Sequence, residues 1–177
     1  IMALSKIDAA NFLTGTIPQG NVANASLNAV TTLPAGVGGK VLQVVTATDN
    51  TQRSTTSTSF VTGSNTLSVD ITPSATSSKI FVTTQFTVGT AVDDQHATYT
   101  IYRDSTDLGD GSGNGMQRCA AYNVGWDVYF PCAMSILDSP SSTSELTYQV
   151  YMKTSTSSGY INYGAGKVSI TAYEISG

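Results

Sequence analysis

The clearest pattern in this chain is an alternation of apolar and polar side chains over residues 67–88. Every second residue from Leu67 to Ile71 is apolar, which is typical of a strand that buries one face. Pro73 and the serines after it predict a turn, because proline cannot donate to a sheet ladder and serine hydroxyls bond nearby backbone groups. Alternation resumes from Ile80 to Val88, so the stretch predicts two strands that form a hairpin or cross between two sheets.

Similar patterns predict strands along most of the remaining chain. The first of them has apolar residues at both parities, so we expect it to be buried on both faces. Pro131 places its strand at a sheet edge or a bulge. The polar residues 49–59 predict a long loop or an exposed edge. These further strands are predicted at residues 41–48, 60–61, 97–103, 127–137, 145–153, 159–163 and 167–175. Their inward positions include Tyr99, Ile101, Val128, Phe130, Cys132, Met134, Ile136, Leu146, Tyr148, Val150 and Met152.

The longest stretch without a period is 104–126, which contains the sequence DLGDGSGNG. Glycine, aspartate and asparagine at this density favour turn geometry over any regular element. We therefore expect one long loop here.

Nine or ten strands with regularly spaced turns predict an all-β fold, an antiparallel β-sandwich of the jelly-roll type over residues 40–177. The composition agrees, since threonine, serine, valine and tyrosine are abundant and only 11% of residues are charged. Residues 1–39 show no sustained period beyond a short predicted helix at 5–13. Their scattered apolar residues predict a segment for attachment and oligomerisation, with a disordered leader as the alternative.

The charge pattern narrows the range of partners. A net charge of −4 with few, scattered lysines and arginines argues against nucleic acid as a partner. No apolar run approaches the roughly 20 residues of a membrane-spanning helix, so no membrane insertion is expected. Cys119 and Cys132 permit a disulfide without requiring one, and two buried reduced thiols are the alternative.

Catalytic motifs are not recognisable. His96 is the only histidine and there is no Gly-x-Ser-x-Gly, so no serine triad can be assigned. Asp104, Asp107 and Asp110 with Asn114 offer oxygen atoms for calcium, but their spacing does not match the twelve-residue calcium loop. Aspartate is also favoured in glycine-rich turns for backbone reasons. The sequence therefore predicts no enzyme, no cofactor and no metal site.

Four stretches resemble the small fibre and virion-adhesin domains of tailed bacteriophages, marine ones in particular. They read MALSKIDAANFLTGTIP at 2–18, ITPSATSSKI at 71–80, YRD at 102–104 and KVSITAYEISG at 167–177. The resemblance implies a virion structural protein, a homotrimeric fibre or adhesin whose residues 1–39 dock to other virion proteins. A capsid-decorating (head fibre) protein is the main alternative, and a free carbohydrate-binding lectin is the third.

The receptor-facing surface is expected in 104–126, with help from 92–96, because a rigid sandwich leaves binding to its loops. Aromatic rings beside amides and carboxylates suit a host-surface glycan, although the same rings would also suit a sandwich end or a subunit interface. The alternative target is a host-surface protein. The candidate receptor-binding residues are Asp94, His96, Asp107, Asp110, Asn114, Tyr122, Asn123 and Trp126, and Tyr129 and Tyr160 are further aromatic candidates.

Overall fold

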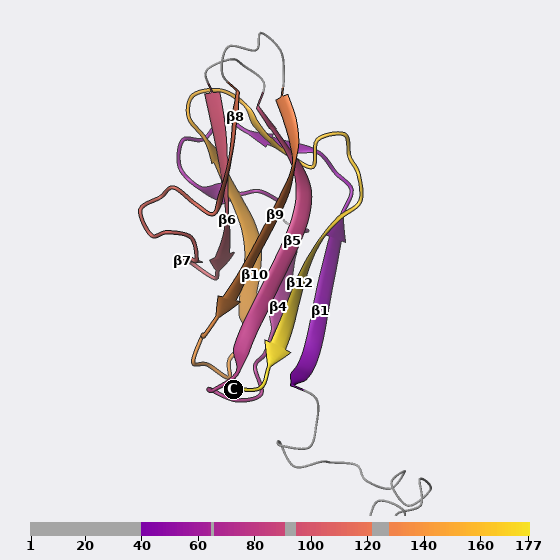
Figure 1. Ribbon diagram of the computed structural model, residues 1–177, viewed down its shortest axis with the longest axis vertical. Helices are drawn as coiled ribbons and strands as arrows, with labels where there is room; N and C mark the ends of the chain where they lie inside the picture. The colour runs from indigo at the N-terminus through magenta and orange to yellow at the C-terminus, as the bar shows by residue number, and fades with distance from the viewer. Residues whose placement is uncertain (1–39, 65, 91–94, 122–127) are drawn as a thin grey trace, which may run out of the picture. The chain divides into compact units, whose positions relative to one another are not determined.

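The computed structural model describes residues 40–64, 66–90, 95–121 and 128–177, and every structural statement below concerns these ranges. They form antiparallel strands throughout (Figure 1). The strands are β1 (Val41–Asp49), β2 (Arg53–Thr55), β3 (Val61–Thr62), β4 (Ser68–Ile71), β5 (Lys79–Thr90), β6 (Gln95–Arg103), β7 (Thr106–Asp107), β8 (Gln117–Ala121), β9 (Val128–Asp138), β10 (Leu146–Thr154), β11 (Gly159–Ile161) and β12 (Val168–Ile175). Within these ranges, no helical segment has the length and apolarity that crossing a bilayer requires.

The eight longest strands form two packed sheets. Sheet A has the order β1-β12-β5-β9, and sheet B has the order β4-β10-β6-β8. Numbered along the chain, these strands run 1-8-3-6 in one sheet and 2-7-4-5 in the other, which is the jelly-roll arrangement. The predicted all-β fold and antiparallel sandwich are therefore confirmed. Short strands extend the sheets, with β11 beside β5, β2 beside β11, β3 beside β10, and β7 beside β6.

The core lies between the sheets and follows the predicted alternation. Tyr148, Val150 and Met152 of β10 are buried, as are Tyr99 and Ile101 of β6. The stretch 67–88 crosses between sheets and is not a hairpin, because β4 pairs with β10 in sheet B and β5 belongs to sheet A. Pro131 lies on β9, which pairs with β5 and forms the edge of the described part of sheet A, as its proline predicts.

Two predictions of burial are wrong. Val44 of β1 is 53% exposed, and Val41 and Leu42 are similarly exposed, because β1 turns one of its apolar faces to the outside of sheet A. Phe130, predicted inward, is 47% exposed because its ring lies at the rim of the gap between the two sheets. The prediction of burial on both faces assumed that the chain itself covers both.

The predicted single loop over 104–126 is also wrong in part. It contains β7, which pairs with the end of β6, and β8, which pairs with the start of β6. The segment QRCAA of β8 shows no clear alternation, so its strand state comes from edge pairing and not from its own pattern.

Residues 108–116 fold back over the outer face of sheet B. The Leu108 N–H donates to the Ile101 carbonyl at 3.0 Å, and the Met116 N–H donates to the Tyr99 carbonyl at 2.8 Å. Beneath this segment lies an aromatic group, here called the sheet B stack, in which the Tyr102 and Tyr151 rings are stacked at 4.0 Å. Its other members are Phe60, edge-on to Tyr102 at 6.1 Å, and Lys153, whose Nζ lies 4.6 Å from the Phe60 ring centre.

The sandwich has two distinct ends. At the tether end, the domain begins at Lys40 and finishes at Gly177, and the Ser176 N–H donates to the Lys40 carbonyl at 2.8 Å. At the distal end, β1, β5, β8 and β10 finish and β6, β9 and β12 begin (Figure 1). The division into 1–39 and 40–177 remains a prediction, and the predicted helix at 5–13 lies outside the described residues.

Glu174 fastens the tether end, although the sequence did not single it out. Its carboxylate is 1% exposed and accepts hydrogen bonds from the Ser74 N–H and hydroxyl, the Ser78 hydroxyl and the Gln43 amide at 2.6–2.8 Å. Burial raises the pKa of Glu174, but these hydrogen bonds outweigh burial and lower it from 4.5 to about 2. The carboxylate therefore ties β12 to β1 and to the β4–β5 connection.

Asp49 has a similar role where β1 finishes. It accepts hydrogen bonds from the Ser64 hydroxyl at 2.5 Å and the Thr51 N–H at 2.9 Å, and Arg53 lies 3.4 Å away. Burial raises the pKa of Asp49, and the hydrogen bonds with the Arg53 charge lower it to about 2. These contacts explain why a carboxylate can lie buried at this position.

Candidate binding site at the distal end

Three tyrosines gather on the outer face of sheet A at the distal end, and we call them the distal tyrosine cluster. The rings of Tyr129 and Tyr163 are stacked, with centres 3.7 Å apart and planes 16° apart. Tyr160 meets Tyr163 edge-on, with centres 5.5 Å apart and planes 77° apart. The cluster thus combines a flat stack with a corner of nearly perpendicular rings.

Strand register explains why residues far apart in sequence meet here. Tyr160 of β11 and Tyr129 of β9 are both register partners of Gly89 on β5. Their side chains point outward, since Ile161 beside Tyr160 and Cys132 on the opposite parity of β9 are buried. Gly89 carries no side chain, so the space above it is left to the neighbouring rings. The Tyr163 N–H then donates to the Thr87 carbonyl, which holds the third tyrosine beside the other two.

The backbone under the cluster is held from inside the sandwich. Tyr99 is fully buried, and its hydroxyl donates to the Tyr160 carbonyl at 2.5 Å and lies 3.4 Å from the Gly89 carbonyl. Burial and the two nearby cysteines raise the pKa of Tyr99 far above its ordinary value, so the hydroxyl remains a donor at any physiological pH. A side chain of sheet B therefore holds β11, which carries Tyr160, and β5, which lies between Tyr160 and Tyr129.

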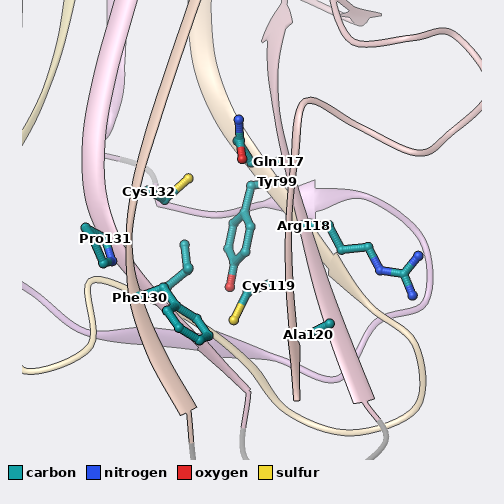
Figure 2. A pocket seen from close by; sticks show the side chains of 9 residues that line it. Tyr99, Gln117, Arg118, Cys119, Ala120, Phe130, Pro131 and Cys132 are labelled. Atoms are coloured by element: carbon teal, nitrogen blue, oxygen red, sulfur yellow. The ribbon is translucent and has the colours of Figure 1, made fainter. Parts of the chain in front are cut away.

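A cavity of about 310 Å³ lies on the inner side of this end, between the edges of β8 and β9 (Figure 2). Its wall combines apolar side chains with two thiols and a few polar groups. The lining residues are Val88, Tyr99, Gln117, Arg118, Cys119, Ala120, Phe130, Pro131 and Cys132.

The two thiols of the cavity have low reactivity. Both cysteines are free and buried, as the alternative to a disulfide anticipated. Burial raises the pKa of Cys119, and burial with the neighbouring Cys119 raises the pKa of Cys132 to about 12. Protonated thiols are poor nucleophiles and poor metal ligands, so they act here as small apolar groups.

Asn162 is one of two residues near the cluster with unused hydrogen-bonding capacity in the described part of the chain, the other being Thr90. Asn162 lies between Tyr160 and Tyr163 in sequence and is 1% exposed, with a positive φ of 54°. Neither its amide nitrogen nor its amide oxygen has a hydrogen-bond partner. Native buried amides are nearly always paired, so a buried water is the expected partner of this one.

Among the described residues, the structure places His96 apart from the other predicted receptor-binding residues, Asp107, Asp110 and Asn114. His96 lies on β6 opposite Ala120, and Asp107 lies opposite Tyr102 on the same strand. Six residues of strand correspond to about 20 Å, so His96 and Asp107 belong to different sites. Asp94, Tyr122, Asn123 and Trp126 lie outside the described residues.

His96 belongs to the framework of sheet B. Its N–H donates to the Ser155 hydroxyl at 3.1 Å, and its carbonyl accepts from the Ser155 N–H at 2.9 Å. Burial and the positive charges of Arg118 and Lys153 lower its pKa below 6.5, so the imidazole is neutral at pH 7. The expectation that His96 is a loop residue is wrong.

The predicted acidic loop is closed by its own hydrogen bonds. Asp107 accepts from the Thr100 hydroxyl at 2.7 Å and from the Gly109 N–H at 2.9 Å. Asp110 accepts from the Ser112 and Asn114 backbone and from the Asn114 amide at 2.8 Å. In the described ranges, no three His, Cys, Asp or Glu side chains stand close enough together to hold a metal ion.

Comparison with known proteins identifies no family. No family model matches the chain, and no curated protein matches it. These searches give no support to the resemblance to tailed-phage fibre proteins, which stays a hypothesis.

Solved structures that match include particles of infectious bursal disease virus. A viral particle shares 20% identity over 78% of this chain and 36% of that chain, with a TM-score of 0.37. The VP2 subviral particle shares 19% identity over 75% of this chain and 36% of that chain, with a TM-score of 0.37. The Gx strain shares 19% identity over 75% of this chain and 37% of that chain, with a TM-score of 0.36. This chain spans little more than a third of those chains, and at such scores the likeness does not bear on function.

Proposed function

We propose that this protein is a non-enzymatic structural component of a virion, a homotrimeric fibre or adhesin that recognises a host-surface glycan with its distal end. Residues 1–39 attach it to other virion proteins. The observation that carries the recognition is the distal tyrosine cluster on a rigid jelly roll. The virion setting rests on the sequence resemblance.

The chemistry of the cluster favours a sugar over other ligands. Tyrosine rings offer flat apolar faces that pack against the C–H faces of a pyranose, and their hydroxyls bond to the sugar hydroxyls. The corner between Tyr160 and Tyr163 can contact two sides of one ring.

The direction in which the domain extends from Lys40 also suits an adhesin. Lys40 lies at the tether end, and β1 runs from there for nine residues, or about 30 Å, toward the distal end. A segment attached through Lys40 would therefore present the cluster at the end farthest from its anchor. The alternatives are a capsid-decorating protein, which the flat outer face of sheet A described below also suits, and a free lectin.

Substitution of the cluster tests this function. Tyr160→Ala and Tyr163→Ala should each weaken adsorption to host cells, or binding on a glycan array, by about 5- to 150-fold, which corresponds to roughly 1–3 kcal/mol. Tyr160→Phe keeps the ring and should retain the stacking part of the affinity. Tyr151→Ala is the matched control, because it removes a stacked tyrosine from the other outer face.

The outcomes separate the three hypotheses. Unchanged binding by Tyr160→Ala and Tyr163→Ala, with folding confirmed by far-ultraviolet circular dichroism, would refute recognition through this cluster. Electron microscopy of labelled particles then distinguishes a capsid decoration from a tail fibre. A protein found only outside particles would support the lectin.

A further inference from the structure

The outer face of sheet A carries a second unusual surface, nearer the tether end than the tyrosine cluster. One row of register partners crosses all four long strands and is apolar or aromatic throughout. It consists of Val44, Tyr173, Phe81 and Leu137. Val44 and Leu137 at its two edges are 53% and 51% exposed, and the Phe81 and Tyr173 rings between them are 6.0 Å apart.

The next row toward the distal end consists of hydroxyl side chains. Register places Thr46 beside Thr171, Thr171 beside Thr83, and Thr83 beside Ser135. The Thr46 and Thr171 hydroxyls lie 3.0 Å apart. A third row contains Thr48, Ser169, Gln85 and Ala133. We call these three rows the flat face.

The flat face carries no charged side chain, since Lys79 lies beyond its apolar row and Lys167 precedes Val168 at the other end of β12. The protein as a whole is acidic, with a net charge of −4. Two acidic copies repel each other at long range, so they meet at least cost through a surface without charge. A basic partner, in contrast, would be attracted to other parts of the surface.

The hydroxyl row also fits a second copy of the same chain. A hydroxyl is both donor and acceptor, so a row of hydroxyls is complementary to an identical row, whereas a row of carboxylates or amines is not. The apolar row is complementary to itself in the same way, because two such rows bury each other's surface. Both properties suit an isologous contact, in which the same surface of two identical chains meets.

The size of the flat face is adequate. Four strands about 4.8 Å apart and three rows about 6.8 Å apart give roughly 19 by 20 Å, or about 400 Å² in projection. The relief of the side chains raises the accessible area toward the roughly 800 Å² per partner of a standard interface.

We infer that the flat face is the surface through which copies of this chain associate. The inference goes beyond the proposed function, because a face that is complementary to itself pairs two copies, and the proposed homotrimer needs a further contact. The distal tyrosine cluster lies beyond the third row, past Thr87 and Pro131, and so remains outside the contact. Association and recognition would then use different parts of one sheet.

The test measures the mass of the whole chain by light scattering and sedimentation velocity at about 1–100 µM. The unsubstituted protein should be a multimer. Leu137→Asp and Val44→Asp should each weaken association by roughly 100-fold or more, because each would bury an unpaired charge. Thr46→Asp should do the same, and Thr62→Asp is its matched control, since Thr62 is an equally exposed outward threonine of sheet B.

Every outcome decides the inference. A monomer across this range would overturn both the inference and the proposed homotrimer, but it would leave the binding test of Tyr160 and Tyr163 standing. A multimer that survives all three flat-face substitutions would place the contact elsewhere. Equal dissociation by Thr62→Asp would show a general charge effect and would also refute the flat face. Far-ultraviolet circular dichroism confirms that each variant is folded. Thr46→Asp leaves the apolar row intact, so it still tests the flat face if Leu137→Asp or Val44→Asp does not fold.

Discussion

The two outer faces of this sandwich carry similar residues in different surroundings. On sheet B, Tyr102 and Tyr151 are stacked, Lys153 lies over Phe60, and residues 108–116 close over the group. On sheet A, Tyr173, Phe81 and Leu137 form an open row, and the described chain leaves Leu137 51% exposed. Aromatic residues on the first face are explained by the chain itself. On the second face, the described residues leave the row uncovered, and the inferred contact between copies would cover it.

The largest effect on the difference between the two faces should come from displacing residues 108–116 from sheet B. Gly115 has a φ of +65°, and a Cβ there would lie 2.7 Å from Thr98 Cγ2 and 2.8 Å from the Tyr99 carbonyl oxygen. Gly115→Ala should therefore lower the free energy of unfolding by about 3 kcal/mol, of which about 1 kcal/mol is the conformational cost of the positive φ and the rest is the clash.

Gly164 provides the matched control on the sheet A side. Its φ is +85°, but no atom lies within 4 Å of the position that a Cβ would take, so Gly164→Ala should cost only about 1 kcal/mol. Urea unfolding measures both variants. Equal losses would mean that residues 108–116 are not clasped to sheet B and that the two faces differ less than the structure indicates.

A change of pH tests whether the two sheets stay docked beneath these faces. The pKa of folded Glu174 is lowered from 4.5 to about 2, so its stabilisation is complete above pH 4.5 and is lost as the pH falls from 4.5 toward 2. The loss should be about 3 kcal/mol if the unfolded pKa is ordinary. The pKa of folded Asp49 is also lowered to about 2, so Asp49 adds a further loss of stability as the pH falls.

Glu174→Gln isolates the contribution of Glu174. This variant should be less stable than the parent at pH 7, because an amide oxygen is a weaker acceptor for the Ser74 and Ser78 groups. Its stability should also vary less between pH 5 and pH 2. Thermal unfolding at each pH measures the loss of stability in acid. A loss in the variant as large as that in the parent would show that Glu174 does not fasten the tether end.

The smallest expected difference concerns the tyrosines themselves. Tyr151→Ala should cost about 2 kcal/mol, since the ring is stacked on Tyr102 within a group that residues 108–116 cover. Tyr163→Ala should cost about 1 kcal/mol, because it removes a stack beside a turn at the end of the sandwich. If Tyr163→Ala were the more costly change in urea unfolding, the distal cluster would be a structural plug and not an available surface.

Most of the fold could be predicted because inward positions alternate along single strands. In β10, Leu146, Tyr148, Val150 and Met152 are all buried as predicted, and the strand needed no information from elsewhere in the chain. β8 could not be predicted in this way, since its strand state depends on pairing with β6. The prediction for β1 was wrong for another reason. The pattern indicates that Val44 favours burial, but it does not say which surface buries it.

The candidate site was less predictable than the fold. His96, Asp107 and Asp110 are close in sequence, but an extended strand of β6 separates the first two, and internal hydrogen bonds engage the other carboxylates. Tyr163 was missed because its meeting with Tyr129 depends on the shared neighbourhood of Gly89. Tyr129 and Tyr160 stand out in the sequence as aromatic residues beside amides and carboxylates, and that composition is the only signal there of the cluster.

The pairing of β1 with β12 also determines how the domain would respond to a pulling force. β1 begins beside Lys40 and runs antiparallel to β12, from Val41 opposite Ile175 to Asp49 opposite Val168. A pull on Lys40 that is resisted at the distal end acts along the axis of β1, so the perpendicular hydrogen bonds of this ladder are sheared together and are not peeled apart one by one. The domain would then yield only when many bonds fail at once, and its survival under tension would depend on a slow unfolding rate more than on its equilibrium stability.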